Sequence, residues 1–513
     1  MVDATTAVPE RPRTAVGFRN GTAFLIDEVP TVDPDGFRRS ALAMCKLGGR
    51  ITALFALPAP GNDAGHDVFL VVAEDDSSRL RILHTRLAPG DELPSLSAEL
   101  AQAQAFEREL YEVHGVSITG HPWLKPLRKH PELAGRPRNA RASDVHPFFQ
   151  VKGPGVHEVA VGPVHAGIIE PGHFRFQCHG EEVLSLEIHL GYQHRGAEAL
   201  LLRSSPARRL VIAESIAGDT AIGHALAYCT AMEALAGASV PLSAHSLRGI
   251  ALELERLANH VGDLGALSGD VAYLPGASYF GRLRGNFLNL LMELSGNRYG
   301  RGLLSVGGVR LALDAATRKS FLERLRKDEA ELEQVAALMF DTASVLSRFE
   351  GTGLVTEETA RDLGLVGLVA RASGLPRDVR HDHPAGIFRF AHIPVTLATS
   401  GDVMARALVR WLEVQRSLIF VQEQIRELPD GPLAERVGAA SPNRMVVALV
   451  EGWRGEIAHV AVTDEKGRLR GYKIVDPSFH NWFGIGMALR GNQISDFPLC
   501  NKSFNLSYAG HDL

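Results

Sequence analysis

The chain has 513 residues, 45% of them hydrophobic and 22% charged, and its 54 basic and 59 acidic side chains give a formal net charge of −5. A chain of this length predicts two or three domains rather than one. Because the charge balance is slightly acidic and offers no broad basic field, nucleic acid is not an expected partner.

The cysteines are few and scattered, at Cys45, Cys178, Cys229 and Cys500. None lies at the spacing of a zinc or iron–sulfur ligand pair, so we predict no such site and a reducing compartment rather than a disulfide scaffold. No run of 18 apolar residues is free of charge, and the polar N-terminus does not read as a secretory signal. Any membrane association is therefore expected to come through partner subunits.

The N-terminal part of the chain predicts a small domain of mixed structure. Residues 1–18 read as a flexible tail, and residues 19–135 as a small α+β domain. The predicted elements are strands over residues 67–73 and 80–85 around a polar turn, and a helix over residues 97–114 that ends near Gly115.

Residues 136–155 are rich in Arg, Pro and Gly and predict a linker, and residues 156–513 form the larger predicted domain. This domain opens with strand-like sequence over residues 156–190. Helical patterns that predict an all-α core follow over residues 206–236, 243–267, 282–295, 317–348 and 403–428. Alternating apolar and polar residues predict a small antiparallel sheet over residues 445–450, 456–463 and 471–475. The fold class is thus α+β, with a large mainly helical second domain.

Phosphate-binding loops are missing from the sequence. It has neither a GxxxxGK[ST] motif nor a GxGxxG motif between a strand and a helix. The glycines of Gly484-Ile485-Gly486 and Gly307-Gly308 read as isolated turn residues. Direct binding of NAD or ATP by this chain is therefore disfavoured.

A Gly/Pro-rich loop over residues 162–174 contains His165, Glu170 and His173. Such a loop can place titratable groups in a buried cleft, where burial and neighbouring charge tune their pKa values. A surface turn with solvated histidines is the alternative interpretation. The sequence then reads His194-Arg195-Gly196-Ala197-Glu198, which by itself is most simply a helix start with Glu198 in a salt bridge.

Together these motifs resemble two related families. A Gly-Pro-x-His loop followed by His-Arg-Gly-x-Glu after a strand, here His165 and then His194 to Glu198, is similar to the quinone-site subunit of respiratory complex I. It is equally similar to the large subunits of energy-converting group 4 [NiFe] hydrogenases, including the formate hydrogenlyase and hydrogenase-4 types.

A third segment bears on nickel. Residues 214–227 align with the hydrogenase motif Cys-Gly-x-Cys-x-x-x-His, with Ala217 and Thr220 at the cysteine positions and His224 retained. The second hydrogenase motif, Asp-Pro-Cys-x-x-Cys, reads Asp476-Pro477-Ser478-Phe479-His480-Asn481, so Ser478 and Asn481 stand where the other cysteines would be. Because soft thiolates hold nickel and its iron partner in that family, the resemblance implies a member without a nickel site.

Both ends of the chain carry the same resemblance. Residues 106–116, followed by Gly120-His121-Pro122, are similar to the thirty-kilodalton subunit of complex I, and residues 491–513 to the C-terminus of its large subunits. Fusion of the two subunits is typical of formate hydrogenlyase-type proteins. The resemblance therefore covers about residues 18–513.

The resemblance also suggests further site residues. By spacing from His260, Asp270 matches a complex I aspartate that serves proton coupling near quinone, although it also reads as an ordinary aspartate at a helix end. In complex I a tyrosine stands at the position of His224 and binds the quinone head group, and a histidine can also donate. Candidates for proton transfer or quinone binding are His165, Glu170, His224 and Asp270. Candidates for lining the cavity are His173, His194, Arg195, Glu198, Asp263, Arg371, Asp378 and Arg380, whose arginines alternatively pair with carboxylates across the domain.

The resemblance implies a peripheral-arm subunit on the cytoplasmic face of the membrane. It would bind a small subunit with a [4Fe–4S] cluster and dock onto antiporter-like membrane subunits. Our leading hypothesis is an oxidoreductase subunit, active only within the complex, at which electrons pass to quinone or a related acceptor without a cofactor in this chain. The alternatives are an inert structural or coupling subunit and, less favoured, a [NiFe] hydrogenase of the formate hydrogenlyase type.

Overall fold

The computed structural model describes residues 15–60, 65–128, 148–165 and 169–513. The chain divides into two compact units, one of residues 1–20 and 24–145 and one of residues 21–23 and 146–513. Residues 1–14 of the predicted tail and residues 136–147 of the predicted linker lie outside the described residues.

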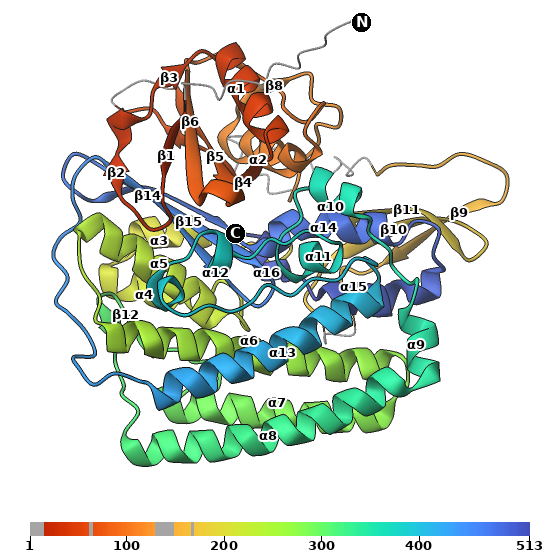
Figure 1. The fold of residues 1–513 in the computed structure, drawn as a ribbon. Helices are drawn as coiled ribbons and strands as arrows, with labels where there is room; N and C mark the ends of the chain where they lie inside the picture. The colour runs from red at the N-terminus through yellow and green to blue at the C-terminus, as the bar shows by residue number, and fades with distance from the viewer. Residues whose placement is uncertain (1–14, 61–64, 129–147, 166–168) are drawn as a thin grey trace, which may run out of the picture. The chain divides into compact units, whose positions relative to one another are not determined.

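The first unit is built on a five-stranded sheet with two helices (Figure 1). The order is β1-β6-β5-β4, and β3 pairs with β6 in parallel. The strands of the unit are β1 (Val16–Phe18), β2 (Phe24–Leu25), β3 (Thr31–Val32), β4 (Arg50–Pro58), β5 (His66–Glu74), β6 (Arg79–Leu87), β7 (Glu92–Pro94) and β8 (Ser117–Thr119). Its helices are α1 (Pro34–Lys46) and α2 (Gln104–His114). The two predicted strands are therefore confirmed as β5 and β6, and the predicted helix is confirmed for its C-terminal part, which ends at a left-handed Gly115.

Helix α1 and strand β4 of the first unit were not among the predicted elements. Asp33 caps α1 by accepting a hydrogen bond from the backbone N–H of Gly36, and Pro34 occupies the first helical position, where its missing N–H is not needed. Phe37, Ala41 and Met44 lie one turn apart and are buried. The cap, the proline and the spacing of the buried residues are all typical of a helix. The segment was not predicted as one because its apolar and polar residues are mixed over a short length.

The second unit opens and closes with antiparallel sheets. The first has the order β11-β10-β9, and in the second β15 pairs with both β14 and β16. Their strands are β9 (Val156–Val161), β10 (His173–His179), β11 (Glu182–His189), β14 (Arg444–Glu451), β15 (Glu456–Thr463) and β16 (Leu469–Val475). The predicted C-terminal sheet is confirmed, and every residue of β15 is buried.

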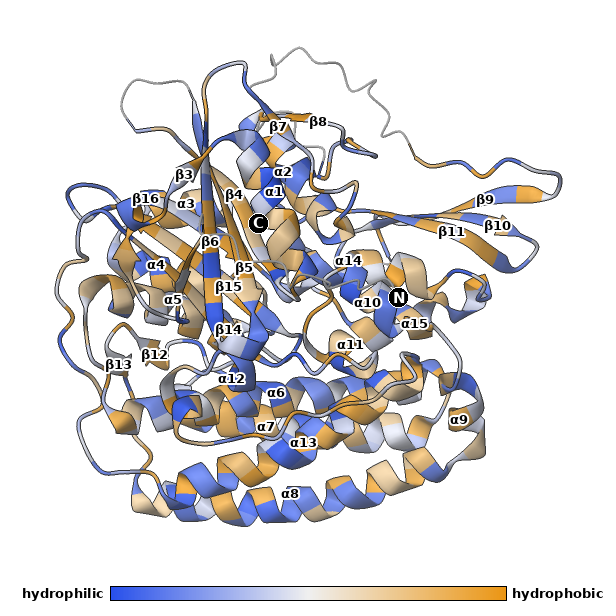
Figure 2. Ribbon diagram, turned by 45° about the horizontal axis from the view of Figure 1, so that its top comes forward, coloured by the Kyte–Doolittle hydropathy of each residue, from blue (hydrophilic) through white to orange (hydrophobic). Residues whose placement is uncertain are grey.

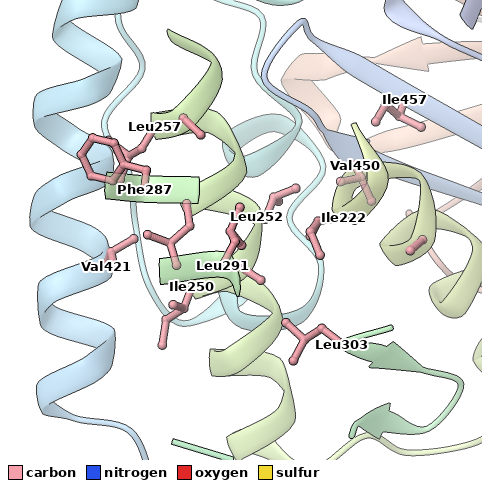
Figure 3. Packing of buried hydrophobic residues seen from close by; sticks show 14 of the residues in the cluster. Ile222, Ile250, Leu252, Leu257, Phe287, Leu291, Leu303, Val421, Val450 and Ile457 are labelled. Atoms are coloured by element: carbon pink, nitrogen blue, oxygen red, sulfur yellow. The ribbon is translucent and has the colours of Figure 1, made fainter. Parts of the chain in front are cut away.

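The core of the second unit is a bundle of long helices. These are α6 (Leu242–Asp270), α7 (Leu274–Ser295), α8 (Ala315–Asp341) and α13 (Val403–Arg426). Helix α6 packs against α7 and α13, and Figure 3 shows Leu257, Phe287 and Val421 from these three helices facing one another. Helix α8 carries both hydrophilic and hydrophobic residues in Figure 2, and its buried ones, among them Phe321, Leu325 and Leu332, recur at helical spacing. Among the described residues, none of the helices has the length and hydropathy that a bilayer crossing requires.

Two of the predicted helices are interrupted. The segment predicted as one helix over residues 206–236 forms α4 (Pro206–Ala213) and α5 (Ala221–Ala236), separated by residues 214–220. The segment predicted as one helix over residues 317–348 forms two helices, α8 and α9, which are separated at Thr342. The shorter elements are α3 (Ala197–Arg203), α9 (Ala343–Phe349), α10 (Glu357–Asp362), α11 (Gly367–Ala372), α12 (Val379–Asp382), α14 (Pro477–Ala488), α15 (Phe497–Phe504), α16 (Tyr508–His511), β12 (Leu304–Ser305) and β13 (Gly308–Val309).

Candidate functional site

The loop of residues 214–220 between α4 and α5 meets the hairpin that joins β14 to β15. Asp219 accepts hydrogen bonds from both terminal nitrogens of Arg454, at 2.6 and 2.8 Å. The hydroxyl oxygen of Thr220 accepts from Arg454 Nη1 and from the indole N–H of Trp453, each at 3.1 Å. These bonds account for the break between α4 and α5, because Asp219 and Thr220 are bonded to the hairpin.

The hairpin itself lies directly on the start of α11. A side-chain carbon added at Gly367 would lie 2.2 Å from the backbone Cα of Gly455, and both glycines have positive φ values. Only glycine tolerates such a contact, because any Cβ atom would separate the two backbones. The position of Arg454 is therefore fixed from two sides, by the loop at Asp219 and by α11.

Arg454 is the common charged neighbour of several carboxylates. Burial by itself would raise the pKa values of Asp219 and Asp476, but the Arg454 charge contributes to a pKa below the ordinary value for both. Glu170 behaves differently. Its side chain is exposed, yet partial desolvation of the carboxyl group raises its pKa, and the Arg454 charge offsets that rise only in part. Its carboxylate accepts a hydrogen bond of 3.3 Å from the backbone N–H of Tyr508. The site thus combines a fixed cation with one carboxyl group that holds a proton more readily than usual.

A chain of four buried polar side chains begins next to this cluster. The Nε2 atom of His224 lies 3.0 Å from Oδ2 of Asp476, and its Nδ1 atom lies 3.1 Å from Nε2 of His459. The Nδ1 atom of His459 lies 2.8 Å from the hydroxyl of Tyr472. Exposure of the four residues is 0% for both histidines, 1% for Asp476 and 4% for Tyr472. Both ring nitrogens of His224 therefore have protein partners.

The four positions that correspond to hydrogenase cysteines are buried, and the polar ones are hydrogen-bonded. Ser478 accepts a bond of 2.9 Å from the backbone N–H of Ser507. Asn481 pairs with both backbone groups of Val366, at 3.0 and 3.1 Å. Thr220 is bonded to the hairpin as described, and Ala217 has no polar atom in its side chain. Within the described ranges, no group of three or more His, Cys, Asp or Glu residues is arranged to hold a metal ion.

The His-Arg-Gly-x-Glu motif supports the site without entering it. Arg195 donates to the carbonyl oxygens of Ser215 and Ile216, at 2.8 and 2.5 Å, and so holds the loop between α4 and α5. His194 lies 3.1 Å from the Leu513 oxygen, and Glu198 accepts a bond of 2.8 Å from the backbone N–H of Ile474 at the end of β16.

The histidines of the Gly/Pro-rich loop bond to that loop rather than to His224. His165 Nε2 donates to the carbonyl oxygen of Gly172 at 2.9 Å, and His173 Nδ1 donates to that of Gly162 at 3.1 Å. Residues 166–168 of the loop lie outside the described residues. Glu170 is thus the member of this loop whose pKa the charge of Arg454 influences.

Asp263 and Asp270 lie further along α6. Asp263 is buried and pairs with Arg410 at 2.9 Å and with Asn505 at 2.6 Å. Asp270 is exposed at the helix end. Partial desolvation of its carboxyl group raises its pKa, and the charge of Lys502 opposes the rise. Glu255 of the same helix accepts hydrogen bonds from the first turn of α5, which carries His224. Asp270 lies about 22 Å further along α6 than Glu255, at 1.5 Å per residue. The structure therefore does not bring Asp270 to His224.

The predicted arginines form a second charged centre with carboxylates of four elements. Arg371 donates to Glu413 at 2.9 Å and to Glu451 at 2.7 Å. Arg380 pairs with Asp378 at 2.6 Å and reaches Glu253 at 3.1 Å. We name the buried set of Glu253, Arg256, His260, Arg371, Asp378, Arg380, Glu413 and Glu451 the arginine cluster. Burial raises the pKa of Glu451 to about 7 against the opposing Arg371 charge, whereas arginine charges outweigh burial at Glu413 and hold its pKa well below the usual value.

Several residues of the site escaped sequence reasoning. Arg454 stands in what reads as an ordinary glycine-bounded turn, and His459 is one polar residue in an alternating strand. Asp219 lies inside a segment with a helical pattern. Asp476 belongs to the Asp-Pro motif, and one of its carboxylate oxygens caps α14. Its second oxygen faces His224, which the motif alone does not indicate.

Comparison with known proteins gives two family matches. Residues 35–141 match the respiratory-chain NADH dehydrogenase 30 kDa subunit, and residues 270–442 match the 49 kDa subunit of the same enzyme. Hydrogenase-4 component G of Escherichia coli K12 is 29% identical over 476 residues, which are 88% of this chain and 82% of that protein. Formate hydrogenlyase subunit 5 of the same organism is 29% identical over 91% of this chain and 85% of its own length. The carbon monoxide-induced hydrogenase of Rhodospirillum rubrum is 31% identical over 68% of this chain and 97% of its own length.

Proposed function

Because the chain belongs to the family of fused 30 kDa/49 kDa complex I-type subunits, related to the large subunits of hydrogenase-4 and formate hydrogenlyase, we propose that it works in a membrane-bound oxidoreductase complex. In this proposal it lies on the cytoplasmic face and binds a small subunit with a [4Fe–4S] cluster and antiporter-like membrane subunits. Electrons from the cluster pass at the Arg454 site to a quinone or a related acceptor.

The proposed reaction uses no nickel. Ala217, Thr220, Ser478 and Asn481 supply none of the soft thiolates that a nickel–iron centre requires. The polar side chains among them are already bonded to backbone or side-chain groups of the chain. This donor set does not fit such a centre.

The observation that carries the proposal is the position of Arg454, which Asp219 and Thr220 hold in place and whose charge acts on the carboxyl group of Glu170. Reduction of a quinone by two electrons adds two protons, so a group that holds a proton beside the acceptor serves as its general acid. A positive group fixed in place stabilises the negative charge that develops on the carbonyl oxygen. His224 is not a direct donor in this arrangement, because Asp476 and His459 occupy both of its nitrogens.

A structural subunit is the second candidate function, and the arginine cluster favours it. Its members join α6, α11, α12, α13 and the end of β14 through buried ion pairs. Such a network makes the large unit a rigid body that can pass on a displacement without any redox chemistry.

Cluster reoxidation distinguishes the two functions. The complex, purified with its small subunit, is reduced and mixed with a quinone analogue, and the cluster is followed by electron paramagnetic resonance. We expect Glu170→Gln to slow reoxidation about a hundredfold, since general acids contribute factors of that order. Glu182→Gln, at an exposed carboxylate on the first residue of β11, is the matched control and leaves the rate unchanged. If no quinone reoxidises an intact cluster in the unaltered complex, the structural function replaces the redox one.

A further inference from the structure

The chain of Asp476, His224, His459 and Tyr472 has a direction that its two ends determine. An ionised carboxylate only accepts hydrogen bonds, so Nε2 of His224 donates to Asp476. Nδ1 of His224 is then the acceptor for Nε2–H of His459, and Nδ1 of His459 accepts from the hydroxyl of Tyr472. Each imidazole donates on one side and accepts on the other.

The environment of the end groups agrees with this direction. Burial raises the pKa of Tyr472 well above its ordinary value, so the phenol keeps its proton. At Asp476 the hydrogen bond from His224 and the charge of Arg454 oppose the effect of burial and contribute to a lowered pKa, so the carboxyl is ionised. Burial lowers the pKa of His459 well below its ordinary value, and the neighbouring His224 adds to this effect. Neutral His459 therefore lies between a protonated phenol and His224.

We propose that these four residues form a proton relay that loads one proton onto the His224–Asp476 pair from the Tyr472 side. A proton arriving at the Tyr472 oxygen lets the phenol pass its own proton to Nδ1 of His459. His459 passes the proton on its Nε2 to Nδ1 of His224. His224 becomes an imidazolium held by the Asp476 carboxylate. One proton enters and one is stored, and no electron moves within the relay.

The relay supplies the proposed redox site, and in this respect it rests on the proposed function. Its inner end lies within reach of the Arg454 charge, which also acts on Glu170. Reduction of one quinone consumes two electrons from the cluster and two protons. Glu170 delivers one proton, and the other passes from Nε2 of the His224 imidazolium to Oδ2 of Asp476 and from that carboxyl group to the acceptor, which leaves His224 neutral and Asp476 ionised again. At the outer end, the ring centre of Tyr228 on α5 lies 6.3 Å from that of Tyr472. The charge of Arg209 on α4 acts on both phenols, so this end of the relay lies near α4.

Removal of one hydroxyl group tests the supply of protons. Tyr472→Phe keeps the ring and deletes the outer donor, whereas Tyr228→Phe makes the same change at a buried neighbour outside the relay. In the reduced complex we expect Tyr472→Phe to slow reoxidation by quinone at least tenfold and to leave reoxidation by ferricyanide, which takes up no proton, unchanged. Tyr228→Phe leaves both rates unchanged. Equal losses in the two variants, or an equal loss with ferricyanide, overturn the relay and indicate a packing defect.

A second measurement does not need quinone turnover and so separates failure of the relay from failure of the proposed function. Histidine nitrogen resonances of the intact complex report which ring nitrogen carries the proton, and His459→Gln assigns the His459 signals. We expect the proton of His459 on Nε2 in the unaltered complex. Asp476→Asn places an amide that can donate at the inner end, and a coupled chain then moves this proton to Nδ1. An unchanged His459 tautomer contradicts a connected relay, whatever the complex does with quinone.

Discussion

The arginine cluster and the histidine relay are both buried and polar, yet they are built from different chemistry. In the arginine cluster, guanidinium groups that stay charged at any physiological pH face carboxylates. In the relay, each link is a group that can both give and accept a proton. The first arrangement fixes the positions of helices, and the second lets a proton move with little movement of atoms. The difference shows that burial of polar groups alone does not indicate which regions of this fold are reactive.

The largest effect is expected from removal of the central carboxylate of the arginine cluster. Glu413→Gln leaves Arg371 and Arg256 buried without their shared counter-charge, and breaking such a network costs about 3–5 kcal/mol of unfolding free energy. Chemical denaturation of the purified complex measures the loss. Glu423→Gln changes an exposed carboxylate on the same helix α13 and is expected to stay within about 0.5 kcal/mol. Similar losses for the two variants contradict the structural role of the cluster.

A pH-dependent effect is expected at Glu255, a buried carboxyl group that belongs neither to the arginine cluster nor to the relay. Burial raises its pKa from 4.5 to about 8, although its carboxylate accepts bonds from the N–H groups of Ile222 and Gly223 at the start of α5. The folded chain therefore binds the extra proton between these values, and stability falls as the pH rises from about 4.5 through 8.

Glu255→Gln tests this sign. A side chain that does not ionise flattens the pH dependence of the unfolding free energy, with a difference of a few kcal/mol between pH 5 and pH 9 as the order of magnitude. Unfolding midpoints of the two proteins at both pH values measure it. A variant that keeps the slope of the unaltered protein assigns the slope to other groups.

A smaller effect is expected at Asn481, one of the positions that the sequence resemblance aligns with hydrogenase cysteines. Asn481→Ala removes the partner of both backbone groups of Val366 and leaves them buried, which costs about 1–3 kcal/mol. Thermal unfolding checks this value. Asn289→Ala, at an exposed position of α7, serves as the comparison for loss of an amide. No loss at Asn481 means that the pair with Val366 is dispensable.

The smallest effect is expected at Asp270. The exposed side chain lies about 22 Å along α6 from Glu255, so Asp270→Asn should change neither stability by more than about 0.5 kcal/mol nor the rate of cluster reoxidation by quinone. The same rapid-mixing experiment measures this rate. A tenfold slower reaction would transfer the proton supply from the relay to the end of α6.

Local patterns made much of the fold predictable. Residues 68–73 are a continuous apolar run between polar residues, as buried strands often are, and Leu247, Ile250 and Leu254 recur at helical spacing and are all buried. The Asp-Pro motif predicts a helix start, and Asp476 caps α14 there. These elements were predictable because neighbouring residues decide them.

Long-range pairing explains what the sequence did not reveal. The helix predicted through residues 214–220 is interrupted because Asp219 and Thr220 bond to Trp453 and Arg454, more than 230 residues away. The inward direction of His459 depends on the register of β15 between β14 and β16. Family resemblance pointed to His224 and Glu170, whereas their partners Asp476 and Arg454 became visible only in three dimensions.

The contact between Gly367 and Gly455 has a mechanical consequence. The hairpin that carries Arg454 lies backbone to backbone on the first residue of α11, and α11 carries Arg371 at its other end. Because no side chain separates the two backbones, a displacement of α11 moves the hairpin and Arg454 with it. Arg371 of the arginine cluster and Arg454 of the site therefore lie on two segments in direct backbone contact, which links the packing of the bundle to the electrostatics of the site.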